Sequence, residues 1–237
     1  MSDLSWSIPV AACAVSAPGV PEIDFVAPMI RRRLSNLSKS GLSVANACLK
    51  DVSNVRLIFA SRHGELKRSS EILHAISAGE PVSPTAFSLS VLNAMTGIFG
   101  MTRHDQLPAT ALSAGDQTLG YAMLEAYAQF ATCRSEPVLL VYADEPADAL
   151  YGVIDNEVCA GALAILIDDQ VAHEQLSCTV STRGEDPSAV DDAPFDYQGT
   201  QSSAFQQCLE TRQPVEWRGP KGMWRWSWEG GAHGNTA

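Results

Sequence analysis

The chain has 237 residues, of which 46% are hydrophobic, and a formal net charge of -11 at pH 7. The length allows one substantial hydrophobic core, whereas the acidic balance argues against nucleic-acid binding, because contacts to phosphates need clustered lysine and arginine. No apolar run reaches the ~18 residues of a membrane span and the start of the chain lacks the basic region of a signal peptide, so we expect a cytoplasmic protein.

The first sixty residues predict two strands separated by helical structure. Residues 6–14 alternate loosely and predict a strand, and residues 28–50 predict a helix or a helix pair with an apolar side. Residues 55–60, Val-Arg-Leu-Ile-Phe-Ala, are typical of a core strand. Strands that alternate with helices indicate an α/β protein.

The helical region contains the one basic run of the chain, Arg31, Arg32 and Arg33, with Lys39 nearby. Two interpretations stay open. The run is either a solvated helix start or a surface that holds an acidic partner.

A polar loop and a helix follow the strand at 55–60. Loops at the carboxyl ends of strands are where α/β proteins keep their sites, so His63, beside Arg62 and Glu65, is a candidate general base with a carboxylate neighbour. The alternative is a polar cluster that fixes the loop or meets a partner. Residues 67–77 predict an amphipathic helix whose apolar side carries Ile72, Leu73 and Ile76.

Residues 85–101 contain no aspartate, glutamate, lysine or arginine. A surface helix needs a polar side, so we expect both sides of this segment to face protein, in a core or an interface.

Residues 108–116, Pro-Ala-Thr-Ala-Leu-Ser-Ala-Gly-Asp, predict a short strand and a tight bend of small residues. The run from 115 to 132 carries only Asp116 and Glu125 as charges and predicts a buried central helix, with Asp116 in the first turn, where the helix dipole favours an anion. Enzymes often place a nucleophile at such a bend.

The second half of the chain predicts further strands and ends in an aromatic segment. Residues 137–143 and 161–167 are continuous apolar runs, typical of strands covered on both faces, and residues 144–157 predict an acidic loop between them. Residues 176–182 predict another strand. Residues 201–212 predict a helix with Phe205 and Leu209 on one side.

Four of the five tryptophans lie between residues 217 and 228. We interpret this segment as an aromatic strand that anchors the terminus to the core or to a partner. The six cysteines are scattered singly, without metal-ligand spacing, and are expected to be buried small thiols.

One chemical interpretation of the bend makes Ser113 an exposed nucleophile of the hydrolase type. It requires an acid and a histidine later in the chain, and only His173 and His233 follow.

A second interpretation rests on a resemblance. Residues 109–115, Ala-Thr-Ala-Leu-Ser-Ala-Gly, resemble the nucleophile bend of the β-ketoacyl-ACP synthases, condensing enzymes of the thiolase fold, which typically reads Ala-Thr-Ala-Cys-x-x-Gly. Residues 61–65 stand where that family has a Gly-rich loop, and the segment from Ser83 through Asn93 to Gly97 is similar to its Ser-Pro … Asn-x-x-x-Gly pattern. The resemblance covers residues 6–180, with three separated motifs in the right order.

More narrowly, residues 31–35, 60–66 and 83–91 resemble the short β-ketoacyl synthase-like, N-terminal domain proteins of aryl polyene pigment clusters, which are regarded as chain-length factors. The resemblance implies an α/β, thiolase-like fold of which only the amino-terminal half, a layered αβα arrangement, is present in residues 1–180. Residues 181–237 are then a C-terminal extension packed on that half or on a partner.

Two departures from the family matter. Leu112 stands at the cysteine's place and provides no nucleophile. The ~57 residues after Val180 are too few for the second half of the fold, which brings the catalytic histidines. His233-Gly234-Asn235 resembles a histidine motif of that half, and we interpret this match as chance.

The resemblance therefore implies a non-catalytic chain-length factor. It forms a heterodimer with an active β-ketoacyl-ACP synthase and shapes that partner's acyl cavity in polyketide or fatty-acid-like biosynthesis, with no cofactor and no metal. The acyl carrier protein is an indirect partner, with Arg31, Arg32 and Arg33 as its candidate contacts. The candidate residues for the acyl cavity or the interface are His63, Thr85, Ala86, Phe87, Val91 and Asn93.

The residues alone lead to a similar expectation. If the segment 85–101 and the helix from 115 are apolar on all sides, a half-size layer structure leaves apolar surface exposed, which favours association at ~25 cal/mol per Å². Two alternatives remain. One is a priming enzyme of the decarboxylase kind that acts on malonyl thioesters through Ser113 or His63, and the other is a homodimeric scaffold.

Overall fold

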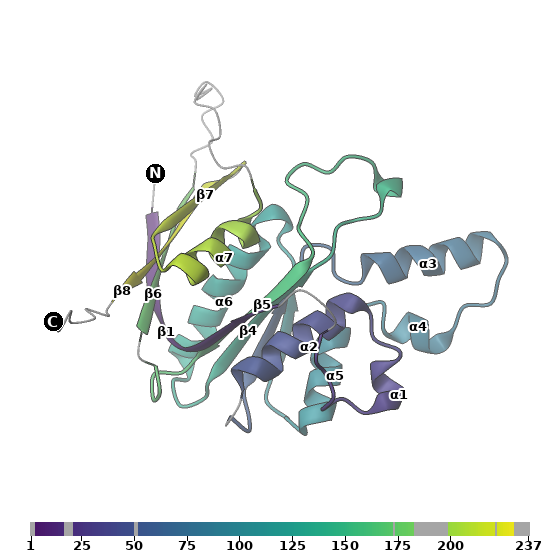
Figure 1. Cartoon of the computed structure of the whole chain (residues 1–237), viewed down its shortest axis with the longest axis horizontal. Helices are drawn as coiled ribbons and strands as arrows, with labels where there is room; N and C mark the ends of the chain where they lie inside the picture. The colour runs from purple at the N-terminus through teal and green to yellow at the C-terminus, as the bar shows by residue number, and fades with distance from the viewer. Residues whose placement is uncertain are drawn as a thin grey trace.

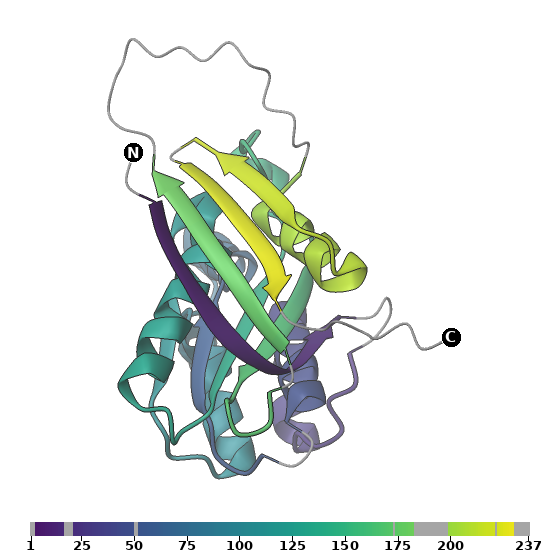
Figure 2. The same cartoon turned by 90° about the vertical axis from the view of Figure 1, so that its left-hand side faces the viewer.

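The computed structural model describes residues 3–16, 21–49, 52–172, 174–182, 199–220 and 222–229. In this part of the chain, eight strands form one sheet in the order β3-β2-β4-β5-β1-β6-β8-β7. The strands β2, β3 and β4 are parallel, and the other neighbours are antiparallel (Figures 1 and 2). Their bounds are β1 Asp3–Val15, β2 Arg56–Ala60, β3 Ala109–Leu112, β4 Val138–Asp144, β5 Gly161–Ile167, β6 Glu174–Thr182, β7 Val215–Gly219 and β8 Gly222–Glu229.

Helices cover both faces of this sheet (Figure 1). The helices α2 and α5 pack on one face, and α6 and α7 pack on the other, so the predicted layered αβα arrangement is confirmed. The helices are α1 Pro28–Arg31, α2 Asn36–Cys48, α3 Leu66–Ser77, α4 Pro84–Ser88, α5 Ala94–Arg103, α6 Thr118–Thr132 and α7 Gln201–Thr211, and the short 3-10 helices are η1 Gly115–Gln117 and η2 Ala149–Tyr151. In the part of the chain that is described, none of the helices has the length and apolar character to cross a membrane.

The central strand β4 shows why the apolar runs form the middle of the sheet. All its residues are buried. Leu140 joins the apolar cluster beneath α6, and its neighbour Val141 joins the cluster beneath α2, because successive side chains of a strand point to opposite faces. Strands covered on both faces need no polar side, and the strands predicted at 137–143 and 161–167 are confirmed.

The C-terminal hairpin of β7 and β8 belongs to the same sheet, in which β8 pairs with β6 (Figure 2). Trp217, Trp224 and Trp226 are each at most 1% exposed. The predicted aromatic strand is therefore confirmed, and it packs on the core of this chain. The domain boundary predicted at residue 180 stays a prediction.

Trp224 fastens this hairpin to α6. Its indole Nε1–H donates a hydrogen bond to Gln117 Oε1 at 2.9 Å, and its ring lies edge-on to Tyr121, with 5.3 Å between centroids. Gly120 leaves room for the ring, because an added Cβ would lie 2.6 Å from Trp224 Cε3.

Two expectations need correction, and a third stays a prediction. The uncharged segment at 85–101 forms α4 and α5. Helix α5 buries one side in this chain, whereas Phe87 of α4 is 64% and Met101 of α5 61% exposed, so the interface expected for this segment stays a prediction. The apolar side predicted for the helix at 67–77 is not covered either, because Leu73 is 61% and Ile76 58% exposed. Helix α6 buries one side only, and Tyr121 on its outer side is 40% exposed. An apolar pattern predicts burial against protein without saying which molecule provides the contact.

The cysteines differ from one another. Cys48, Cys178 and Cys208 are buried, as predicted, and burial raises the pKa of Cys48 to about 12, which keeps the thiol protonated. The prediction is wrong for the other three, because Cys13 and Cys159 are exposed and Cys133 is half-buried.

A buried carboxylate, Glu65, joins the helices that flank the loop after β2. It accepts hydrogen bonds from the hydroxyls of Ser35 at 2.6 Å and Ser38 at 2.7 Å, at the start of α2. Its second oxygen lies 3.3 Å from Arg68 Nε of α3, and Arg68 Nη2 also donates to the carbonyl of Arg33 at 3.0 Å. The side chain is 4% exposed, so these partners replace its water.

The substitution G120A should lower the free energy of unfolding by about 1–3 kcal/mol, because the new methyl group overlaps a rigid indole. Its control is G97A in α5, where nothing lies within 4 Å of the added Cβ; this variant should gain about 0.5–1 kcal/mol from helix propensity. Urea denaturation followed by tryptophan fluorescence measures both. Equal effects of the two substitutions would contradict the assigned contact.

The substitution E65A should lower the free energy of unfolding by roughly 3 kcal/mol, because it leaves the partly buried Arg68 without its anionic partner and the hydroxyls of Ser35 and Ser38 without their acceptor. E71A removes an exposed carboxylate from α3 and should change the free energy of unfolding by less than about 0.5 kcal/mol. Chemical denaturation of both variants checks the difference, and a tolerated E65A would refute the anchoring role.

Candidate functional site

The bend after β3 has the predicted strand, elbow and helix. Gly115 has a φ of +64°, in the left-handed region that favours glycine. The N–H of Ala114 donates to Thr118 Oγ1 at 2.9 Å, and this hydroxyl donates to the carbonyl of Gly115 at 2.7 Å. These bonds satisfy backbone groups at the start of the helix and fix the bend.

Among the described residues, the side chains at the tip of the bend have no base within hydrogen-bond reach. Leu112, at the end of β3, is half-buried and packs against the core cluster beneath α6. Ser113 is exposed, and its hydroxyl donates to the backbone carbonyl of Arg62 at 2.9 Å. A carbonyl oxygen accepts a hydrogen bond but cannot take up the proton, so this contact does not activate the serine.

The loop from Ser61 to Gly64 wraps around the carboxylate of Asp144, which ends β4 and is 1% exposed. Asp144 accepts hydrogen bonds from Ser61 Oγ at 2.8 Å and from the N–H groups of Arg62 at 2.8 Å and His63 at 3.1 Å. Burial, and secondly the neighbouring Asp144, raise the pKa of the Tyr142 hydroxyl. Our sequence reasoning missed Asp144, although an acidic residue at the end of an apolar strand was a usable signal.

His63 pairs with a carboxylate other than the predicted one. Its Nε2 lies 2.7 Å from Glu157 Oε1, at the end of the acidic loop, whereas Glu65 binds Ser35 and Ser38. Partial burial raises the pKa of Glu157, but the hydrogen bonds from His63 and from the N–H of Val158 outweigh it, so the pKa of this carboxyl is lowered. The imidazole holds a loop in place, in agreement with the alternative given for this cluster.

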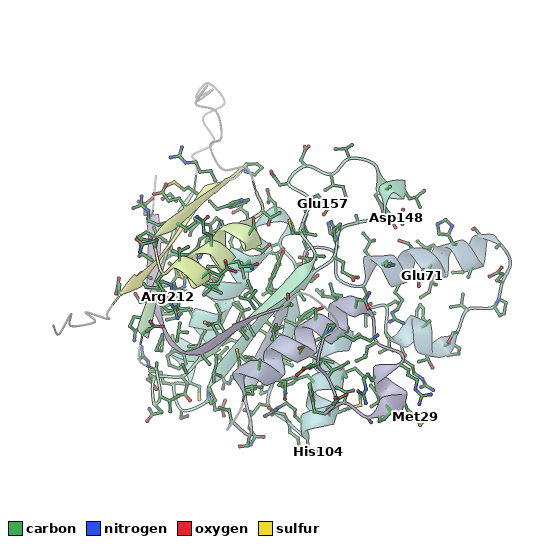
Figure 3. The ribbon with its side chains drawn as sticks, in the orientation of Figure 1. Met29, Glu71, His104, Asp148, Glu157 and Arg212 are labelled. Carbon is green, nitrogen blue, oxygen red and sulfur yellow. The ribbon has the colours of Figure 1, made fainter. Side chains whose placement is uncertain are left out.

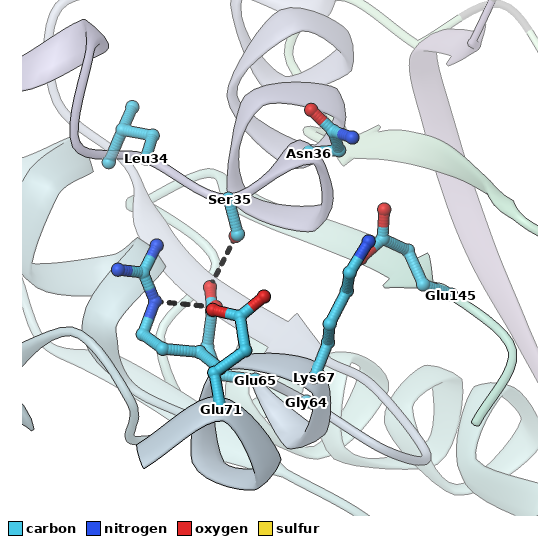
Figure 4. A pocket seen from close by; sticks show the side chains of 9 residues that line it. Leu34, Ser35, Asn36, Gly64, Glu65, Lys67, Glu71 and Glu145 are labelled. Carbon is cyan, nitrogen blue, oxygen red and sulfur yellow. Dashed lines mark hydrogen bonds and ion pairs between the residues drawn. The ribbon is translucent and has the colours of Figure 1, made fainter. Parts of the chain in front are cut away.

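A polar pocket of about 210 Å³ lies beside Glu65 (Figure 4). Lys67, Glu71 and Glu145 line its rim. Burial raises the pKa of Glu145, while the positive charge of Lys67 opposes that shift. Serine, asparagine and charged side chains line this pocket, and neither Leu112 nor Ser113 does.

The candidate residues for an acyl cavity lie together at the surface. Thr85, Ala86 and Phe87 belong to α4, Val91 is 47% exposed just after it, and Asn93 is the residue before α5. His63 lies outside this group, in the loop after β2.

The three segments that carry the narrower resemblance, residues 31–35, 60–66 and 83–91, lie next to one another in space. The loop after β2 contacts α2 and the arginine run through Glu65 and Arg68. It contacts the segment after α4 through Gly64, where an added Cβ would lie 3.0 Å from Leu92 Cδ1, and through Ser69 Oγ of α3, which donates to the carbonyl of Ser90 at 3.3 Å.

The three arginines of the basic run differ in their contacts. Arg31 forms an ion pair with Asp24. Arg32 and Arg33 are exposed and form no ion pair with the residues that the structure describes. They line an open hollow of about 470 Å³ together with Arg68 and with Thr85 and Ala86 of α4.

The serine interpretation of the bend required a downstream histidine. His173 and His233 both lie outside the described residues. Neither is therefore placed beside Ser113.

Comparison with solved structures identifies similar folds. One match is the ketosynthase (ApeO) in complex with its chain length factor (ApeC) from Xenorhabdus doucetiae, with 25% identity and a TM-score of 0.73, covering 94% of this chain and 99% of that chain. The ishigamide ketosynthase/chain length factor matches with 15% identity and a TM-score of 0.52, covering 75% of this chain and 55% of that chain. The structure of AntDE:AntF, a type II PKS acyl-carrier protein in complex with its ketosynthase, matches with 12% identity and a TM-score of 0.56. This match covers 75% of this chain and 69% of that chain.

No curated protein matched the sequence. The family model described as "Beta-ketoacyl synthase, N-terminal domain" matches residues 4–227, which is most of the chain and includes the tryptophan-rich hairpin. The fold is accordingly thiolase-like. The chain belongs to the β-ketoacyl synthase N-terminal domain family.

Proposed function

We propose that this chain is a non-catalytic chain-length factor, which pairs with an active β-ketoacyl-ACP synthase and shapes the acyl cavity of that partner. The observation that carries the proposal is the bend after β3. It keeps the strand, elbow and helix at which the family places its cysteine, and it holds Leu112 there. A leucine side chain cannot form a thioester with an acyl group.

The surroundings of the bend support the same conclusion. A covalent catalyst needs a nucleophile within hydrogen-bond reach of a base. The hydroxyl of Ser113 is bound to a carbonyl, and the imidazole of His63 is bound to Glu157. The two side chains that could replace the cysteine therefore have other partners.

A complex of similar fold supports a ketosynthase partner. The match to the ApeO and ApeC structure covers nearly all of both chains, so the chain matched there is about as long as this one. That structure is described as a ketosynthase in complex with its chain length factor. By analogy, we assign this chain a ketosynthase partner in a type II polyketide pathway, of the aryl polyene kind.

Exposed apolar residues supply the surface that such a partner would cover. Phe87 and Val91 are 64% and 47% exposed on and just after α4, next to Thr85 and Ala86. Covering apolar surface contributes ~25 cal/mol per Å². Bulk at these positions would close the far end of the partner's cavity and limit the number of extension cycles.

The acyl carrier protein enters the proposal through the arginine run. Arg32 and Arg33 are exposed and line the hollow beside α4. An acidic carrier protein that approaches the complex would be attracted to this region.

The purified chain alone should not turn over malonyl-carrier protein, neither by decarboxylation nor by condensation. The measurement is carbon dioxide release and mass spectrometry of the carrier protein, with S113A and H63A beside the wild type. Turnover by the wild type that is lost in either variant would favour the priming enzyme instead. L112C alone should also show no condensation.

Replacing Phe87 by alanine should lengthen the products of the reconstituted complex. One methylene in an apolar pocket is worth about 1–3 kcal/mol, so removal of the phenyl group should raise the ratio of longer to shorter products by about 10-fold or more. Co-expression with a full-length ketosynthase of the same organism, followed by sizing and product analysis, checks both pairing and length. M101A removes an exposed apolar side chain from α5 and should leave the distribution unchanged; an unchanged distribution with F87A would refute the cavity role.

A further inference from the structure

One side of the molecule carries an acidic zone, an apolar zone and a basic zone in a row, on the right of Figure 1. The acidic loop, residues 145–157, includes η2 and contacts α3 through the Tyr151 and Ser70 hydroxyls, 2.6 Å apart. The apolar zone consists of α3 and α4, which pack on each other. The basic segment, residues 28–39, adjoins α4 at the hollow that Arg32 and Arg33 share with Thr85. Figure 3 labels Asp148, Glu71 and Met29 along this row.

The acidic loop presents apolar side chains from a fixed backbone. Leu150 is 66% and Val153 99% exposed. The loop is anchored at its end by the His63 and Glu157 contact, and Arg62 donates to the carbonyls of Asp155 at 3.1 Å and Asn156 at 2.5 Å. An anchored loop loses less conformational entropy when it binds a partner.

The exposed charges of the acidic loop are Asp148 and Asp155, which form no ion pair with the residues that the structure describes. Asp148 Oδ1 accepts a hydrogen bond from the N–H of Leu150 at 2.9 Å and so begins η2. The side chain of Asp155 makes no such bond within the described part of the chain. Glu71 of α3 adds a further exposed carboxylate nearby.

The basic segment lines two surface hollows and also exposes an apolar side chain. Arg32 and Arg33 are exposed, Met29 is 69% exposed, and Arg32 also lines a second hollow of about 560 Å³ with Lys39 and Ile23. Glu22 and Asp24 on the rim of that hollow offset part of the charge, and Asp24 is already paired with Arg31. Side chains such as Leu150 and Val153 could enter such a hollow while their acidic neighbours meet the arginines.

The middle zone exposes four large apolar side chains, although α3 also exposes Lys67, Glu71 and His74. Leu73 and Ile76 of α3, and Phe87 and Val91 on and after α4, are between 47% and 64% exposed. Apolar surface of this kind in adjacent elements marks an interaction site.

A face that is acidic at one end, apolar in the middle and basic at the other end is complementary to itself. A two-fold axis through the middle zone sets the acidic loop of one copy against the basic segment of the other, twice, and stacks the apolar zones. We propose that the chain forms a symmetric homodimer through this face when its ketosynthase is absent.

The homodimer and the proposed heterodimer both cover α4, so each excludes the other. This competition rests on the proposed function, whereas the self-association does not. The homodimer would keep the apolar zone out of water until the ketosynthase displaces one copy.

A charge-swap experiment tests the inference. The variant R32E/R33E reverses the basic segment, and D148N/D155K reverses the acidic loop, with asparagine at 148 because it keeps the acceptor that begins η2. Each variant alone brings like charges together at both contacts and should dimerise roughly 10-fold or more weakly than the wild type. A mixture of the two variants restores opposite charges at both contacts and should dimerise like the wild type.

Analytical ultracentrifugation over a concentration series measures the association, and circular dichroism confirms that each variant is folded. R134E/R218E reverses two exposed arginines outside the three zones and should leave the dimer unchanged. A monomeric wild type, or a mixture that associates no better than its components, would overturn the inference. If the chain is a monomer but copurifies with a ketosynthase, the homodimer is refuted and the proposed function stands. If the chain is a homodimer but binds no ketosynthase, the proposed function is refuted and the homodimer stands.

Discussion

The indole of Trp224 lies on the backbone of α6 at Gly120, and the placement of the bend depends on this contact. The helix begins at the bend, so whatever fixes its first turns also fixes Leu112 and Ser113. Trp224 does so from β8, and its N–H donates to the side-chain oxygen Oε1 of Gln117. The tryptophan-rich end of the chain is thus part of the core that supports the bend.

Two buried carboxylates complete the scaffold on the other side of the bend. Asp144 binds the backbone of the loop after β2, and Glu65 ties the end of that loop to the start of α2. Both carboxylates are occupied by structural partners. They hold the backbone of the loop after β2 in position beside the bend.

The sequence predicted the backbone architecture better than the side-chain partners. The apolar runs at 137–143 and 161–167 and the small residues at 113–115 each determine a local structure, because periodicity and φ preferences are local properties. The partner of His63 could not be inferred, since Glu157 is distant in the sequence and the nearer Glu65 turns to Ser35 and Ser38. The exposure of Leu73, Ile76 and Phe87 in this chain could not be predicted from the apolar pattern either, because hydrophobicity does not say which chain covers a side chain.

For the candidate site, too, the sequence predicted the local structure but not the contacts between distant segments. The bend and its leucine follow directly from residues 109–115, and the gathering of three motifs around Glu65 required the tertiary structure. Asp144 had a signal in its position at the end of a buried strand. The order in which the chain crosses the sheet places the acidic loop, the apolar helices and the basic segment along one side. A local sequence pattern does not contain that order.

The contact between His63 and Glu157 links the acidic loop to proton binding. The pKa of Glu157 is lowered in the folded protein from its ordinary value of 4.5. Its contribution to stability is therefore fully present above that value and is lost as the pH falls through the folded-state pKa. Over the neutral range this carboxylate stays ionised and keeps its end of the loop anchored, and only acid releases it. The loop that carries Leu150 and Val153 is therefore held at Glu157 by a carboxylate that stays charged across the neutral range.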